Sequence, residues 1–151
     1  MSVAERLAAE GLKIPGAPKP VAVYVPAVRS GHHVFTSGQL PMVAGELMAT
    51  GKVGGDVSVE TAYDCARQCA LNAIAAVASQ VDVEQIVRVV KATVFVASTP
   101  DFTGQPGVAN GASELFGLAF GDAGLHARSA VGVSALPLDA PVEVELVVEI
   151  A

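Results

Sequence analysis

Small hydrophobic residues recur at three- and four-residue steps between Ser58 and Gln80, which is the spacing of one face of an α-helix. Ser58 is a good N-cap residue, and the acidic Glu60 follows it in the first turn. The repeating positions are Ala62, Ala66, Cys69, Ala73 and Val77. Because alanine and cysteine make this face thin, we expect the helix to lie close to a sheet.

Two further helices are predicted from the residues at their ends. Ser2 and Glu5 have the spacing of a capping box, so residues 2–10 should form a short amphipathic helix. Pro106 is typical of a first helical turn and predicts a helix from there to about Phe120. The stretch KIPGAPKP at 13–20 has three prolines in eight residues and predicts an extended arm.

Strands are predicted wherever β-branched and apolar residues form runs or alternate with polar residues. These runs are 21–28, 33–37, a short segment around 47–48, 86–98, 129–136 and 142–150. With the two longer helices, the order β-β-β-α-β-α-β-β indicates an α+β fold with a single mixed sheet. Both helices should pack on one face of that sheet, and a partner subunit could cover the other face.

Composition and charge narrow the possible partners. Charged residues make up 16% of the 151 residues, against about 25% in an average domain. This deficit fits either burial in an oligomer or a flat, alanine-rich surface. The net charge of −6, without a lysine or arginine cluster, argues against nucleic acid. No apolar run reaches the roughly 18 residues of a membrane span, so no membrane partner is expected, and without a secretory leader we expect a cytoplasmic location.

The chain has no phosphate-binding glycine loop and no nucleophile motif. Cys65 and Cys69 have the spacing of two ligands but lack a second ligand pair, so we interpret them as small core residues. We therefore expect neither a metal nor another cofactor. Any chemistry here should depend on electrostatic positioning and water.

Arg128 is the first candidate functional residue. Period-two alternation places it on one strand face with Ala130, Gly132 and Ser134, and these small neighbours leave room for a ligand. A guanidinium suits a carboxylate in a bidentate geometry, although Arg128 could instead pair with a carboxylate of its own chain. On the last strand, Glu143 could hold a water or move a proton, or simply belong to a solvated face.

Three segments together carry a family resemblance. VFTSGQLP at 34–41, KATVFVAS at 91–98 and ARSAVGVSALPLDAPVEVELV at 127–147 resemble the RidA family, also called the YjgF family. The resemblance covers about residues 21–151. Residues 1–20, the helix and the arm, fall outside it and are similar to a subgroup with an N-terminal helical extension. It implies a chorismate-mutase-like α+β fold and a homotrimer with clefts between subunits.

The resemblance also implies an activity, the hydrolysis of reactive enamines and imines such as 2-aminoacrylate to 2-keto acids and ammonia. Arg128 would bind the substrate carboxylate with the backbone N–H of Ala130, and Glu143 would position water. The other family site positions fall on Tyr24, Ser37, Gly38 and Asn110. Many members have cysteine where this chain has Ala130 and glutamate where it has Gly132, so we expect a larger pocket.

Two other functions stay open. The same clefts could bind a small carboxylate metabolite without turnover, and the departures at Ala130 and Gly132 favour this alternative. Some members of the family are described as ribonucleases or translation inhibitors. The acidic charge of the chain argues against that third function.

Overall fold

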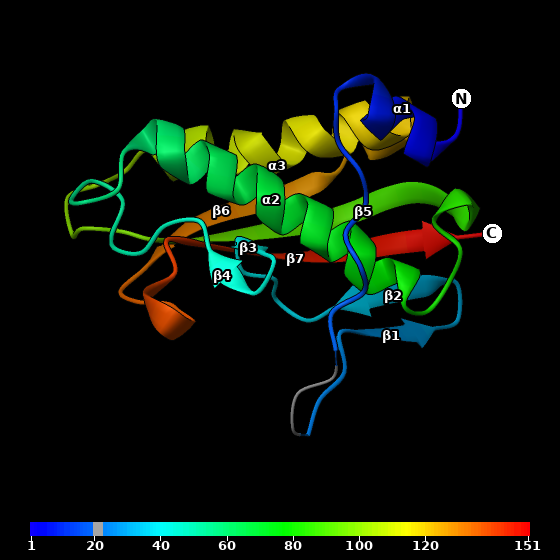
Figure 1. The fold of residues 1–151 in the computed structure, drawn as a ribbon, viewed down its shortest axis with the longest axis horizontal. Coiled ribbons are helices and arrows are strands. Elements are labelled where there is room, and N and C mark those ends of the chain that lie inside the picture. The colour runs from blue at the N-terminus through cyan, green and yellow to red at the C-terminus, as the bar shows by residue number, and fades with distance from the viewer. Residues whose placement is uncertain (20–22) are drawn as a thin grey trace.

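The computed structural model describes residues 1–19 and 23–151, and its centre is a mixed β-sheet (Figure 1). In the described part of the chain the sheet has five strands in the order β1-β2-β7-β5-β6. Their bounds are β1 Ala27–Ser30, β2 His33–Thr36, β5 Ile86–Ala97, β6 Ala127–Val133 and β7 Val142–Ile150. Neighbouring strands are antiparallel except β5 and β6, which are parallel. The predicted α+β fold with one mixed sheet is confirmed.

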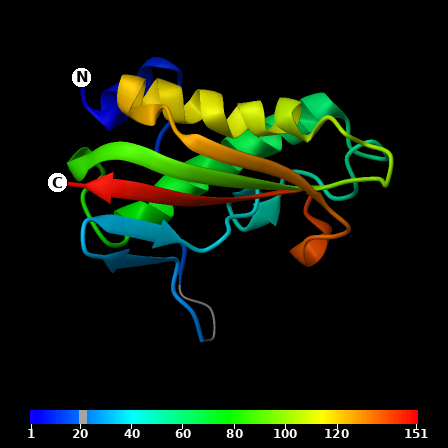
Figure 2. The ribbon, with the colours of Figure 1, turned by 180° about the vertical axis from the view of Figure 1, so that it is seen from behind.

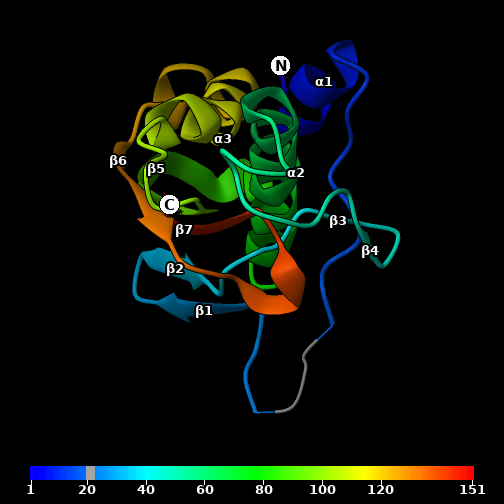
Figure 3. The same ribbon diagram turned by 90° about the vertical axis from the view of Figure 1, so that its left-hand side faces the viewer.

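Helices α2 (Val59–Ala78) and α3 (Gln105–Phe120) cover one face of the sheet (Figure 3). Ser58 caps α2 as predicted, because its side chain accepts a hydrogen bond from the N–H of Thr61. The chain also forms three short 3₁₀ helices, at Val83–Gln85, Gly121–Gly124 and Pro137–Asp139, within the described ranges. Alternate residues of β7, from Val142 to Ile150, are buried beneath the helices and form the core with the small residues of α2.

The short helix α1 (Val3–Ala9) is part of the folded core. It begins with the predicted capping box between Ser2 and Glu5, and it packs against α3. Leu7 is fully buried, and the N–H of Val3 donates to Glu84 Oε1 at 2.7 Å. After α1 the arm runs across α2, where Leu12 and Ile14 pack against the core (Figure 1).

The first and third predicted strands differ from the structure. Of the predicted strand 21–28, residues 21 and 22 lie outside the described residues, and β1 begins only at Ala27, because Pro26 cannot donate to a strand ladder. The predicted third strand lies outside the main sheet, in a ribbon of β3 (Met42–Val43) and β4 (Glu46–Leu47). The left-handed turn at Ala44 and Gly45, with φ of 51° and 84°, closes this ribbon.

Strand β6 is also shifted relative to the predicted range 129–136. It begins at Ala127, so Arg128 lies inside the strand, and it ends at Val133. Its neighbour β5 ends at Ala97, the residue aligned with Val133, so no partner strand continues beyond this point.

No helix covers the second face of the sheet in the part of the chain that the structure describes (Figure 2). Phe35 on β2 is 48% exposed and Val131 on β6 is 42% exposed. On β7, Glu143, Glu145 and Val147 alternate with the buried residues and are half-buried. We call this surface the open face.

Candidate functional site

Arg128 lies on the edge strand β6, and its side chain points to the helix side of the sheet. Its aligned residue on β5 is Ala92, which is buried beneath the helices. Arg128 Nη1 donates to Asn110 Oδ1 at 2.9 Å and to Ser113 Oγ at 3.1 Å, both on α3. These two bonds use both hydrogens of Nη1. The Nε and Nη2 hydrogens have no acceptor among the described residues and form a fork of the shape that a carboxylate accepts.

No carboxylate of the described residues neutralises this guanidinium. The ion pairs in these ranges join Lys52 to Asp139 and Arg88 to Glu149. The alternative interpretation, in which Arg128 pairs with an acidic group of its own chain, is therefore wrong for the described residues. The two partners of Arg128 are neutral, so its positive charge remains available to a ligand.

The space beside Gly132 is occupied, contrary to the prediction of a larger pocket. A Cβ on Gly132 would lie 2.8 Å from Nε2 of Gln105, the first residue of α3. Gln105 is held there by hydrogen bonds to the carbonyl of Phe102 at 2.7 Å and to Ser98 Oγ at 3.3 Å. A long polar side chain from another element thus fills the volume that the glycine leaves.

Glu143 lies on the open face, where it is aligned with Phe95 of β5. Its carboxylate lies against Gly38, because a Cβ on that residue would be 1.8 Å from Glu143 Oε1. Only glycine permits this approach. Burial, and after it the negative charge of Glu145, raise the pKa of Glu143 above its ordinary value of 4.5. A carboxylate with a raised pKa is a better proton acceptor than an ordinary glutamate.

The segment after β2 is fixed by hydrogen bonds on both sides. Gln39 exchanges two backbone bonds with Val144 of β7, at 2.8 and 3.0 Å. Ser37 donates its N–H to the carbonyl of Pro26 at 2.8 Å and its hydroxyl to the carbonyl of Val25 at 2.7 Å. The predicted Ser37 and Gly38 thus lie between the start of β1 and the residue Glu143.

Tyr24 and Gly38 line a cavity of about 480 Å³ on the side of the arm. The arm forms one wall, and residues 38–45 with α2 form the others. Asn72 of α2 holds the second wall in place by donating to the carbonyls of Leu40 and Met42, at 2.9 and 3.0 Å. Tyr24 is 57% exposed, so it forms part of the outer rim of this cavity.

The predicted site residues form two groups within one chain. Arg128 and Asn110 are in direct contact on the helix side, and the half-buried Ala130 follows on the same strand. Gly38 and Glu143 are in contact, Ser37 precedes Gly38 on the chain, and Tyr24 lines the same cavity as Gly38. One chain does not bring the two groups together, because Arg128 and Glu143 lie on opposite faces of the sheet.

Sequence reasoning missed Ser113 and Gln105. Ser113 follows Asn110 by three residues, so both lie on the same face of α3, and that spacing was the available signal. Nothing in the sequence signalled that Gln105 fills the space beside Gly132. The described residues contain no group of three or more metal-ligating side chains. Burial raises the pKa of Cys65 to about 11 and that of Cys69 well above its usual range, and both thiols are free and buried, which confirms their interpretation as core residues.

Comparison with known proteins decides the family. The family model described as Endoribonuclease L-PSP, which represents the YjgF/RidA family, matches residues 15–150. The chain belongs to the RidA family. Across the described residues of this RidA protein, no helix is long and apolar enough to cross a membrane.

Relatives of this RidA protein carry several names. It is 43% identical over 150 residues to Protein TCP17 of Trypanosoma cruzi, covering 98% of this chain and 94% of the relative. It is 33% identical over 131 residues to 2-iminobutanoate/2-iminopropanoate deaminase of Escherichia coli K12, covering 87% and 90%. These relatives support a RidA-type function.

Solved structures agree with this fold. A protein of unknown function from Agrobacterium tumefaciens has a TM-score of 0.92 at 44% identity, covering 99% of this chain and 92% of its own. Escherichia coli TdcF with bound serine has a TM-score of 0.65 at 30% identity, covering 89% and 94%. The first alignment includes the N-terminal helix and arm, because it covers nearly the whole RidA protein.

Proposed function

We propose that this RidA protein hydrolyses 2-imino acids, and the 2-enamino acids that tautomerise to them, to 2-keto acids and ammonia. The observation that carries the proposal is the unpaired Nε–Nη2 fork of Arg128 in a protein whose relatives include 2-iminobutanoate/2-iminopropanoate deaminases. The family resemblance implies a carboxylate-binding arginine at this position. The fork supplies two parallel hydrogen bonds and a positive charge to a small carboxylate.

The complete site is proposed to form between subunits of a homotrimer. Arg128 and Glu143 lie on opposite faces of one sheet, so a single chain cannot apply both to a small substrate. The open face, with exposed Phe35 and Val131, is the surface on which a neighbouring copy would pack. In that arrangement Arg128 of one subunit faces Gly38 and Glu143 of the next.

The reaction then needs only positioning, water and one proton carrier. The Arg128 fork and the backbone N–H of Ala130 hold the carboxylate, while Glu143 and the carbonyl of Gly38 hold a water beside the imine carbon. Water adds to the C=N carbon as Glu143 accepts its proton, and the nitrogen takes up a proton. The C–N bond of the resulting tetrahedral adduct breaks, ammonia leaves, and the keto acid remains. A positioned base contributes about 10²–10⁴-fold.

Binding without turnover is the second candidate. It is favoured by Gln105, which brings an amide to the space beside Gly132 where many relatives carry glutamate. A protein of this kind would bind a 2-keto acid in calorimetry but would not accelerate imine hydrolysis.

The two free, buried cysteines are compatible with the reducing cytoplasm, where we propose that the protein acts.

The test is an imine hydrolysis assay. 2-Iminobutanoate is generated enzymatically in the cuvette, and release of 2-ketobutyrate is measured with wild type, Arg128→Ala and the control Arg29→Ala. Arg29 is exposed on the edge strand β1 and its side chain donates to the carbonyl of Gly31, so its loss should leave the rate unchanged. Arg128→Ala should reduce kcat/KM by about 10²-fold or more, because the carboxylate loses a bidentate charged partner. Equal rates for wild type and Arg128→Ala would refute the proposal.

A further inference from the structure

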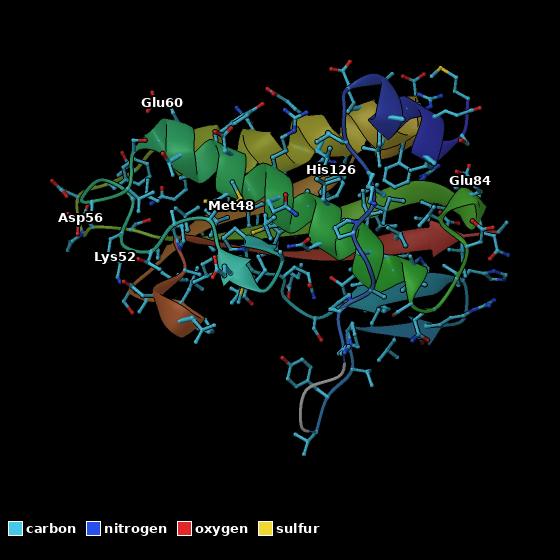
Figure 4. All side chains as sticks on the ribbon, viewed as in Figure 1. Met48, Lys52, Asp56, Glu60, Glu84 and His126 are labelled. Carbon is cyan, nitrogen blue, oxygen red and sulfur yellow. The ribbon has the colours of Figure 1, made fainter. Side chains whose placement is uncertain are left out.

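A chain of hydrogen bonds leads from Arg128 into the interior, on the side away from its free fork. Ser113 Oγ accepts from Arg128 Nη1 at 3.1 Å and lies 2.9 Å from Nε2 of His126. The other ring nitrogen, His126 Nδ1, lies 2.6 Å from the carbonyl oxygen of Gly124. His126 is two residues before Arg128, and its ring lies beside α3 (Figure 4).

For a neutral ring, the partners of His126 set the direction of every bond in this chain. A carbonyl oxygen can only accept, so Nδ1 carries the hydrogen and donates it to Gly124. In the neutral ring Nε2 is then an acceptor, and the hydroxyl of Ser113 donates to it. With its hydrogen committed to His126, Ser113 Oγ turns its lone pairs toward Arg128 Nη1.

The position of the ring is fixed by packing. His126 contacts the fully buried Phe116 edge-on, with ring centroids 5.5 Å apart and an interplanar angle of 89°. Gly124 can approach α3 only because it has no side chain, since a Cβ there would lie 2.3 Å from the carbonyl oxygen of Phe116. The carbonyl that orients His126 is therefore held by the packing of Gly124 against α3.

We infer that His126 is a positioning residue for Arg128, acting through the hydroxyl of Ser113. This inference rests on the proposed function of Arg128 as the carboxylate-binding group. Asn110 and Ser113 are the two acceptors that hold Nη1, and together they orient the Nε–Nη2 edge away from α3. Without His126 the Ser113 hydroxyl rotates freely, and the guanidinium must be ordered when the ligand binds.

The test measures ligand affinity rather than stability. His126→Phe keeps an aromatic ring against Phe116 but removes both ring nitrogens, and Ser113→Ala removes the hydroxyl. Each should weaken the Kd for 2-ketobutyrate and raise KM by about 3- to 10-fold, as expected for one lost hydrogen bond, with kcat nearly unchanged. The double variant should be no weaker than the worse single variant, because both act in one chain of bonds. His32→Phe, at an exposed turn, is the matched control and should leave Kd unchanged.

Two further measurements separate this role from a structural one. Ser113→Thr retains a hydroxyl and should restore the Kd that Ser113→Ala loses, even if both variants melt at a lower Tm. If Ser113→Ala and His126→Phe keep the wild-type Kd while Arg128→Ala loses binding, the positioning role is wrong and the proposed function stands. A fall in kcat at constant KM in either variant would also overturn the inference. If Arg128→Ala retains the wild-type Kd, the proposed function itself fails.

Discussion

Mixing two inactive variants should restore activity if the site is shared between subunits. Within one chain, Arg128 is aligned with Ala92, and Ala92 with Leu146, which is three positions from Glu143. Arg128 and Glu143 are thus two strands apart across the sheet and three residues apart along the strands, which places their backbones about 14 Å apart. Their side chains also point to opposite faces of the sheet. That separation exceeds the span of a four-carbon acid. Arg128→Ala and Glu143→Gln therefore damage different halves of each site.

The expected recovery follows from symmetry. In a closed ring of equally mixed subunits, each site receives an intact Arg128 with a chance of one half and an intact Glu143 with a chance of one half. About one quarter of the sites should then be complete, so the mixture should regain about 25% of wild-type kcat/KM. The assay is 2-ketobutyrate release after the two variants are unfolded, mixed and refolded together.

A matched mixture controls for refolding. Arg128→Ala refolded with a chain carrying both substitutions contains no intact Arg128, so it should stay inactive. If the Arg128→Ala and Glu143→Gln mixture is only as active as the average of its components, each site lies within one chain. The proposal that neighbouring subunits complete the site would then be refuted.

Three other perturbations test individual contacts. Gly38→Ala should abolish activity, because its Cβ would lie 1.8 Å from Glu143 Oε1 and displace the carboxylate. Glu145→Gln should lower the pKa of Glu143 by removing a neighbouring negative charge, so the acid limb of the kcat/KM profile should move to lower pH. Gly111→Ala should destabilise the fold by about 1–3 kcal/mol, because its Cβ would lie 2.1 Å from a carbonyl oxygen of α2. Gly117→Ala should stabilise the fold by about 0.5–1 kcal/mol, because the space around Gly117 is open and alanine favours a helix.

Each of these results has a clear contrary outcome. A Gly38→Ala protein with wild-type rates would show that Glu143 need not stay where it lies. An acid limb that does not move in Glu145→Gln would mean that the carboxyl group of Glu143 does not control it. Urea unfolding with equal free energies for Gly111→Ala and Gly117→Ala would show that the approach of α3 to α2 is not tight.

The sequence predicted the elements better than their relation in space. Periodicity located α2, and capping residues located α1 and its first turn, because these signals are local. The strand predicted around 47–48 was expected within the main sheet, but it pairs with β3 in a separate ribbon, since a local pattern does not show which sheet a strand joins. The alternation of residues along β6 and β7 correctly assigned side chains to the two faces of each strand. It did not show which of these faces lies beneath the helices. That information depends on the parallel alignment of Arg128 with Ala92.

The site was predictable in its residues and less so in its contacts. Arg128 was identified from its small neighbours, yet the volume beside Gly132 depends on Gln105, which lies 27 positions earlier in the chain. The network through Ser113 and His126 was not foreseen, because its contacts join α3 to β6 and to the residue just before β6. Such contacts are set by packing between elements, on which a single sequence carries little information.

The opening helix has a practical consequence for handling the protein. Leu7 is fully buried, and the backbone N–H of Val3 donates to Glu84 in the 3₁₀ helix before β5. A shortened form that lacks residues 1–9 would expose to water the apolar side of α3 that α1 covers. We expect such a form to self-associate through this apolar surface. An affinity tag should therefore be attached without removing or disrupting α1.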